Sequence, residues 1–294
     1  MRFKRLIFLI AFLIPGALVF LQSCGNKKEN EAEITVSIEP LKYFVEELTS
    51  WDIEVNVMVP MGASPATYSP TASQLTGLSS SRLYVQAGYL GFEQAWMPRL
   101  KELNPELKVL NLSTDLNLIR GEDHVHGDHV HKGGVDPHIW MSPKVVMEFL
   151  PRLRESLIET FPEYKQEIVQ QYPELYGRIK KQHEAFAKLG THLKKKEFMI
   201  FHPALTYLAR DYGLKQIPLE YEGKEPTPQK LRNLIDLANK ANIKVIFIQV
   251  EFDRKSAGMV TEETDASLVP LNPLAHDWDG EMKRIHDLLE EYLK

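Results

Sequence analysis

The feature that most constrains the fold of this 294-residue chain is an alternation of short β-rich runs with amphipathic helical stretches, which occurs twice. The β-rich runs of the first half are residues 34–38, 54–59, 83–87 and 107–112. Those of the second half are residues 196–201, 214–219, 244–250 and 267–271. Strands that alternate with helices form mostly parallel sheets covered by helices. The sequence therefore predicts an α/β fold with two lobes, each with a mostly parallel sheet flanked by helices.

The middle of the chain is helical and predicts a connector between the two lobes. Apolar residues recur every three or four positions from residue 163 to residue 189. A helix of about 25 residues spans roughly 40 Å, which suits a rigid spine. Pro173 is expected to kink or restart this helix, and His183 on its apolar face is expected to be a core residue rather than a ligand. The predicted domains are an N-terminal lobe, a helical connector and a C-terminal lobe, over residues 34–142, 143–190 and 191–294.

The N-terminus predicts export. A basic start is followed by an apolar run over residues 6–20, which is shorter than a typical membrane span. Cys24 is the only cysteine, so it forms no internal disulfide. The sequence L-Q-S-C-G resembles the lipobox of bacterial lipoproteins, in which the cysteine is lipidated. This resemblance implies a signal peptide over residues 1–23, lipidation of Cys24 and a polar tether over residues 24–33. An uncleaved anchor or a chance cysteine is the alternative.

Potential metal ligands are concentrated between Gly121 and Pro143. Four histidines lie in the loop 123–131, namely His124, His126, His129 and His131. Short His-rich tracts cannot build a core but can bind ions, although a solvated loop that meets metal only incidentally is the alternative. His138 differs, because it follows an Asp-Pro step and precedes Trp140, which indicates a fixed backbone.

The predicted sheets also indicate where a ligand binds. Ligands of open α/β sheets bind beyond the carboxyl ends of the strands. The loops over residues 60–70 and 112–142 both follow strand ends, so they are expected to face a common cleft. His202 also falls at the carboxyl end of a strand, although a core or capping histidine is the alternative there.

Several motifs occur in a fixed order: D-P-H-I-W-M-S-P after the His-rich loop, F-H-P-A-L-T-Y-L-A-R-D-Y-G-L, E-P-T-P and P-L-N-P-L-A. In this order they resemble the zinc-binding lipoproteins of ABC-type metal importers, over about residues 34–294. The resemblance implies two α/β lobes joined by a long spine helix, with one transition-metal ion in the cleft between them. The family ligands are a histidine in a G-x-x-P-H-x-Y loop, a histidine in a D-P-H-x-W turn, a histidine after the first strand of the second lobe, and an aspartate in a late D-P-L motif.

Only two of these ligand positions match in this chain. His138 occupies the D-P-H position and His202 the second-lobe position. Ala66 stands where the first-lobe histidine is expected, and Asn272 replaces the aspartate. Two neutral imidazoles and an amide oxygen make a weaker, uncharged site, so Asn272 is at best a weak ligand. Water, Glu251 or a histidine of the loop is expected to complete the site.

The resemblance implies a lipid-anchored protein of the bacterial cell envelope that faces the periplasm or the cell exterior. It is expected to capture Zn²⁺ and deliver it to the permease of an ABC transporter. Zinc is favoured over Mn²⁺ because His202 sits where manganese members carry an oxygen ligand. A monomer is expected, and a formal charge of -5 gives no reason to expect nucleic acid.

Two other functions stay open. One is a divergent family member with an altered metal or an adhesin-like surface role. The other is a metallohydrolase, since two histidines and water resemble an open catalytic zinc site. A hydrolase also needs a general base and an oxyanion partner, and no H-E-x-x-H or G-x-S-x-G motif occurs. The sequence therefore predicts a binding protein and no enzyme.

Overall fold

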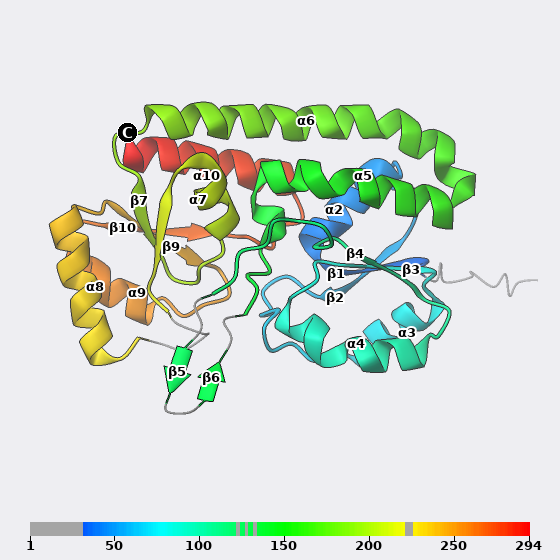
Figure 1. Ribbon diagram of the computed structural model, residues 1–294, viewed down its shortest axis with the longest axis horizontal. Coiled ribbons are helices and arrows are strands. Elements are labelled where there is room, and N and C mark those ends of the chain that lie inside the picture. Colours follow the sequence, from blue (N-terminus) through cyan, green and yellow to red (C-terminus); the bar gives the residue numbers. More distant parts are fainter. Residues whose placement is uncertain (1–31, 122–123, 127–128, 132–133, 221–225) are drawn as a thin grey trace, which may run out of the picture. The chain divides into compact units, whose positions relative to one another are not determined.

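The computed structural model describes residues 32–121, 124–126, 129–131, 134–220 and 226–294 (Figure 1). Residues 32–294 form one compact unit. The predicted signal peptide, Cys24 and most of the predicted tether lie outside the described residues. None of the described helices is long and apolar enough to cross a membrane.

The first sheet has four parallel strands in the order β2-β1-β3-β4. All five residues of β1 are buried, as expected for a central strand with helices on both faces. Helix α2 lies on one face of this sheet, and α3 and α4 lie on the other (Figure 1). The bounds are β1 Ile34–Ile38, α2 Glu39–Leu48, β2 Val55–Val59, α3 Ala72–Ser80, β3 Leu83–Gln86, α4 Gly91–Leu103 and β4 Lys108–Asn111.

The second sheet is also parallel and has the order β10-β9-β7-β8. Helix α7 ends at Gly213, whose φ of 68° is the left-handed conformation that glycine adopts easily. Thr227 caps α8 by accepting a hydrogen bond from the backbone of Lys230. The bounds are β7 Glu197–Ile200, α7 Thr206–Tyr212, β8 Lys215–Pro218, α8 Pro228–Ala241, β9 Val245–Gln249, α9 Lys255–Glu262, β10 Ser267–Leu271 and α10 Trp278–Leu293. Two helix-flanked parallel sheets confirm the predicted fold class, whereas the predicted domain boundaries stay predictions.

Two long helices follow the first sheet, α5 (Pro143–Thr160) and α6 (Lys165–His192). The sequence predicts that Pro173 kinks or restarts the spine helix. The restart is wrong, because α6 is one helix of 28 residues with Pro173 inside it, and the kink stays a prediction. A proline in a helix leaves the carbonyl four residues earlier without its partner. Here that residue is Val169, which is 53% exposed, so water can satisfy its carbonyl. His183 is half-buried rather than part of the core, and its Nδ1 lies 3.0 Å from the Tyr212 hydroxyl.

Side chains on α6 connect α2 of the first lobe to α10 of the second. Arg178 on α6 donates through Nε to Asp279 Oδ2 at 2.9 Å and also bonds Glu47 on α2. Tyr43 on α2 donates its hydroxyl to the same Asp279 oxygen at 2.6 Å. These contacts form a polar cluster of Tyr43, Glu47, Arg178 and Asp279 that joins the two lobes through the spine helix.

The His-rich segment, which the sequence predicts to be a loop, contains paired backbone. Its backbone forms two short antiparallel strands, β5 (His124–His126) and β6 (His129–His131), with His124 opposite His131. Each strand has the sequence His-Val-His, and the two runs are separated by Gly127-Asp128. Two alternating runs separated by Gly-Asp predict a β-hairpin, which the interpretation as a metal-binding loop does not consider. A backbone bridge between Arg120 and Val135 closes the base of the segment.

Candidate metal site

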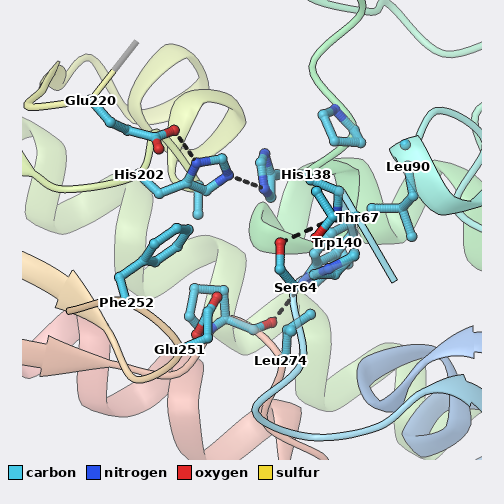
Figure 2. Close-up of a pocket in the computed structure, with 16 residues that line it drawn as sticks. Ser64, Thr67, Leu90, His138, Trp140, His202, Glu220, Glu251, Phe252 and Leu274 are labelled. Atoms are coloured by element: carbon cyan, nitrogen blue, oxygen red, sulfur yellow. Dashed lines mark hydrogen bonds and ion pairs between the residues drawn. The ribbon is translucent and has the colours of Figure 1, made fainter. Parts of the chain in front are cut away.

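A pocket of about 370 Å³ opens where the carboxyl ends of both sheets meet (Figure 2). The first lobe contributes segments that follow β2, β3 and β4, and the second lobe contributes residues that follow each of its four strands. The expectation that the loops 60–70 and 112–142 face a common cleft is therefore confirmed. The lining includes Ala66, Leu90, His138 and Trp140 on one side and His202, Glu220, Glu251 and Phe252 on the other.

His138 and His202 face each other across this pocket. Their Nε2 atoms lie 3.2 Å apart, and their ring centroids are 5.0 Å apart. Zinc binds histidine nitrogens at about 2.0–2.1 Å. Two such nitrogens 3.2 Å apart would form an N–Zn–N angle of about 100°, close to the tetrahedral value. The two histidines therefore already have the separation of two zinc ligands.

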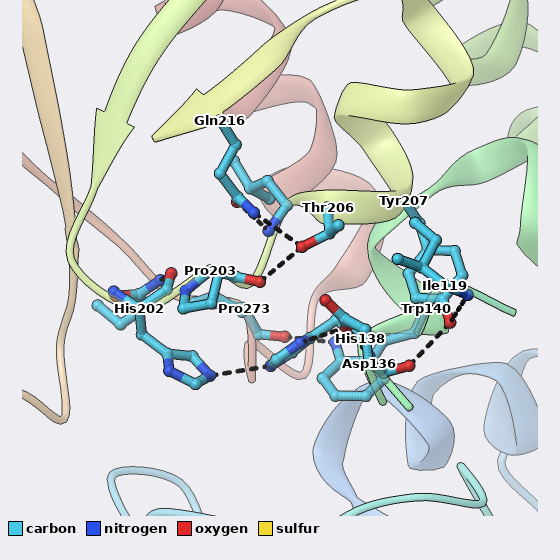
Figure 3. A network of polar contacts seen from close by, with 12 residues as sticks. Ile119, Asp136, His138, Trp140, His202, Pro203, Thr206, Tyr207, Gln216 and Pro273 are labelled. Carbon is cyan, nitrogen blue, oxygen red and sulfur yellow. Dashed lines mark hydrogen bonds and ion pairs between the residues drawn. The ribbon is translucent and has the colours of Figure 1, made fainter. Parts of the chain in front are cut away.

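The outer nitrogens of both histidines contact carboxylates. His138 Nδ1 lies 2.8 Å from Asp136 Oδ1, and His202 Nδ1 lies 2.5 Å from Glu220 Oε1 (Figures 2 and 3). An ionised carboxylate only accepts hydrogen bonds, so each neutral imidazole carries its proton on Nδ1. The two Nε2 atoms then face each other at 3.2 Å, a distance that a shared proton or a bound metal ion can bridge. A carboxylate behind each imidazole is also the usual second layer of a zinc site.

Burial raises the pKa of both Asp136 and Glu251, but other interactions offset it to different extents. Burial raises the pKa of Asp136, but the interactions with His138 lower it more, so its net pKa lies below the ordinary value. Burial raises the pKa of Glu251, and this effect outweighs the hydrogen bond from its own backbone and the nearby His202. Asp136 is therefore a well-compensated anion, whereas Glu251 is a poorly compensated one.

Both histidines have fixed backbones. The side chain of Gln249 accepts a hydrogen bond from His202 N at 3.1 Å and donates one to His202 O at 2.7 Å. The turn after Asp136 is held by Tyr207, whose hydroxyl donates to the Asp136 carbonyl at 2.8 Å (Figure 3). Trp140 then donates from its indole nitrogen to the Pro273 carbonyl at 2.8 Å, which joins the turn to the second lobe. The imidazoles are thus pre-positioned before any metal binds.

The two departures from the family pattern lie in different places. Ala66 lines the pocket, and the carbonyl of its neighbour Pro65 accepts a hydrogen bond from Phe92 N at 2.9 Å. Asn272 is not among the lining residues, although Pro273 and Leu274 are. In the described part of the chain, the buried Asn272 Oδ1 has no hydrogen-bond partner. The weak ligand role of Asn272 stays a prediction.

No set of three histidine, cysteine, aspartate or glutamate residues within the described residues already has metal-binding geometry. Only the backbones of His124, His126, His129 and His131 are described, so their metal binding stays a prediction. Sequence reasoning missed the roles of Asp136 and Glu220. Both had a signal: Asp136 is the first residue of the D-P-H motif, and Glu220 closely follows the strand next to β7.

Comparison with known proteins gives a consistent result. A family model described as "Zinc-uptake complex component A periplasmic" matches residues 34–293. A crystal structure of ZnuA superposes with a TM-score of 0.81 at 32% identity, covering 89% of this chain and 98% of that one. A zinc-bound deletion mutant of ZnuA gives a TM-score of 0.80 at 32% identity, covering 89% and 97%.

Curated relatives are more distant in sequence. The zinc-binding lipoprotein AdcA of Streptococcus pneumoniae R6 is 25% identical over 92% of this chain and 55% of its own length. The high-affinity zinc uptake system protein ZnuA of Bacillus subtilis 168 is 24% identical over 90% of this chain and 87% of its own length. The chain thus spans about half the length of the first of these relatives and most of the second.

Proposed function

Since this chain belongs to the family of the periplasmic zinc-uptake complex component A, we propose that it captures zinc outside the cytoplasmic membrane and delivers it to an ABC-type importer. The observation that carries this proposal is the pair of Nε2 atoms 3.2 Å apart, each on a ring whose Nδ1 contacts a carboxylate. The zinc-bound state of a 32%-identical structural relative supports zinc as the transported ion.

The pocket suits transport because it holds two imidazoles and lies between the two lobes, both of which contribute to its lining. A transport protein must release its ion, so a site with few protein ligands is compatible with delivery to a permease. We assign no reaction to this pocket. A divergent member with another metal or a surface-binding role is a weaker alternative, because the spacing of the two imidazoles already fits zinc.

The test is metal analysis and zinc titration of the purified mature protein, with variants of the two histidines. His138→Ala and His202→Ala should each weaken zinc binding by at least about tenfold, because each removes one of two imidazole ligands. His192→Ala is the matched control, since His192 is exposed on α6 and its Nδ1 lies near Thr191 Oγ1 and Lys188 O of the same helix. Parental zinc affinity in both cleft variants would overturn the proposed function.

The lipid anchor at Cys24, delivery to a permease and the monomeric state belong to the same proposal. The lipobox-like sequence L-Q-S-C-G supports the anchor, and relatives named as zinc-binding lipoproteins support it too. Cys24→Ser should leave the protein unlipidated, so that it no longer fractionates with membranes. A variant whose signal peptide is cleaved but which still fractionates with membranes like the parent would contradict the anchor.

A further inference from the structure

The proposed site lacks a third strong protein ligand. Zinc usually binds four donors, and a site with an exchangeable position still has three from the protein. His138 and His202 supply two. Ala66 on the pocket wall carries no donor atom in its side chain, and Asn272 lies outside the lining. The remaining acidic groups of the lining are Glu220, which is bonded to His202, and Glu251.

Glu251 has a carboxylate oxygen without a partner. In the described part of the chain, its Oε2 is buried and makes no hydrogen bond. A buried carboxylate oxygen without a partner costs free energy, so native proteins usually pair it or use it to bind a cation. Glu251 lines the same pocket as the two facing histidines and appears on the same side as Phe252 in Figure 2.

The turn that carries Glu251 is tied to His202. Gln249, two residues before Glu251, bonds both the backbone N–H and the carbonyl of His202. Phe252, the next residue, donates its backbone N–H to the Gln249 carbonyl at 3.2 Å. The Phe252 ring stacks on the His202 ring, with centroids 5.4 Å apart and planes at 27°. Glu251 is therefore fixed at its backbone beside one metal ligand, while its side chain keeps an unpaired oxygen.

We propose that Glu251 is the third protein ligand of the transported metal ion and takes the role that Ala66 cannot fill. This inference rests on the proposed function. Because no three potential ligands of the described chain already have metal-binding geometry, the carboxylate must turn about its side-chain bonds when the ion enters. That rotation breaks no hydrogen bond of Oε2. It also pairs a desolvated anion with a desolvated cation.

This ligand set predicts which ions the site accepts. Two imidazoles and one carboxylate form a less nitrogen-rich site than three imidazoles do, and carboxylate oxygen suits harder divalent ions such as Mn²⁺. The site is therefore expected to bind first-row divalent metal ions and to separate Zn²⁺ from Mn²⁺ less sharply than a three-histidine site. Removing the Glu251 charge should weaken Mn²⁺ more than Zn²⁺.

The experiment compares Glu251→Gln with Glu262→Gln in protein that lacks residues 123–131. Glu262 is exposed on α9 and serves as the matched control. Zinc affinity is measured by chelator competition, and coordination is read from the d–d absorption of the Co²⁺-loaded protein. Glu251→Gln should lower zinc affinity by at least about tenfold and change the Co²⁺ spectrum, because one charged ligand is lost. Its metal-free melting temperature should not fall, since the variant removes the negative charge of a buried carboxylate whose Oε2 has no hydrogen-bond partner in the described part of the chain.

The outcomes separate this inference from the proposed function. In one outcome, Glu251→Gln keeps the zinc affinity and Co²⁺ spectrum of the parent while His138→Ala and His202→Ala lose zinc affinity. That result would overturn only the role of Glu251. Parental affinity in all three variants would overturn both. A lower melting temperature of metal-free Glu251→Gln together with an unchanged Co²⁺ spectrum would make Glu251 a structural residue and would also overturn the inference.

Discussion

At the scale of single residues, two carboxylates orient the imidazole rings of His138 and His202. Asp136 and Glu220 each accept a hydrogen bond from Nδ1, so both Nε2 lone pairs point into the pocket. The same two carboxylates therefore fix the orientation of both imidazole rings toward each other.

The first residue-scale prediction restores the family ligands. Ala66→His combined with Asn272→Asp supplies an imidazole and a negative charge, so zinc affinity should rise. In protein lacking residues 123–131, the dissociation constant should fall by at least about tenfold, or roughly 1.4 kcal/mol. Because Ala66 lines the pocket and Asn272 does not, Ala66→His alone should give most of the gain. Chelator competition measures the zinc dissociation constants of the single and the double variant. An unchanged constant, with His138 and His202 also dispensable, would place the metal elsewhere.

The second residue-scale prediction concerns Glu93, whose carboxylate binds the backbone just before α4, next to the lining residue Leu90. It is 1% exposed and accepts hydrogen bonds from the backbones of Ala87, Gly88 and Leu90, at 2.7, 2.7 and 3.2 Å. Burial still raises its pKa above the ordinary value, against these hydrogen bonds and one from Ser37. A carboxyl group with a raised folded-state pKa contributes stability below its unfolded pKa, and this contribution is lost as pH rises through the folded value.

Glu93→Gln lacks this titration. The free energy of unfolding of the parent minus that of Glu93→Gln should therefore be largest below the ordinary glutamate pKa, about 4.3, and smaller at neutral pH. Urea unfolding of the metal-free proteins across this range measures the difference, and other titrating groups cancel because both proteins carry them. A difference that grows with pH would contradict the assignment.

At the scale of elements, the periodicity of the sequence predicted nearly every helix and strand of the two lobes. It failed at two places with clear physical causes. Pro173 does not restart α6, because the carbonyl that it leaves unpaired belongs to the exposed Val169. The His-rich segment contains two paired strands, because its His-Val-His runs alternate with the period of a strand. The third ligand was left open, because neighbours in the pocket come from strand ends far apart in the sequence.

The third prediction concerns the hairpin. His124, His126, His129 and His131 should bind extra zinc weakly, with binding that fades as pH falls because protons compete for imidazole. Calorimetry on a variant that lacks residues 123–131 should show the weak sites lost and one tighter site retained. Replacing the four histidines with glutamine in the full-length chain is the control for the change in length. An unchanged stoichiometry in both variants would contradict this role.

The fourth prediction concerns the spine helix. Arg178 forms ion pairs with both Glu47 and Asp279. Arg178→Ala removes this cation, so both carboxylates lose an ion-pair partner. The free energy of unfolding should fall by roughly 1–2 kcal/mol, as for other partly buried charged hydrogen bonds. Lys180→Ala on the same helix is the control, because its pairing with Glu184 is exposed, and it should change stability by less than about 0.5 kcal/mol. Equal effects in chemical denaturation would contradict the role of the cluster in joining the lobes.

At the scale of the whole molecule, the two sheets meet at their carboxyl ends, and each contributes one histidine to the pocket. Trp140 links the lobes beside the site by bonding the Pro273 carbonyl, and Trp278 in turn donates to the Trp140 carbonyl at 2.7 Å. The polar cluster on α6 links them on the helical side. Metal affinity should therefore depend on how closely the lobes approach, because the ion needs both histidines at once.

If the proposed function is right, one zinc ion binds between His138 Nε2 and His202 Nε2. Anomalous diffraction at the zinc absorption edge, from crystals of the zinc-loaded protein, locates this ion. We expect one strong anomalous peak in the pocket, within about 2.1 Å of both Nε2 atoms. A pocket without a peak, or a zinc ion that contacts neither histidine, would contradict the claim.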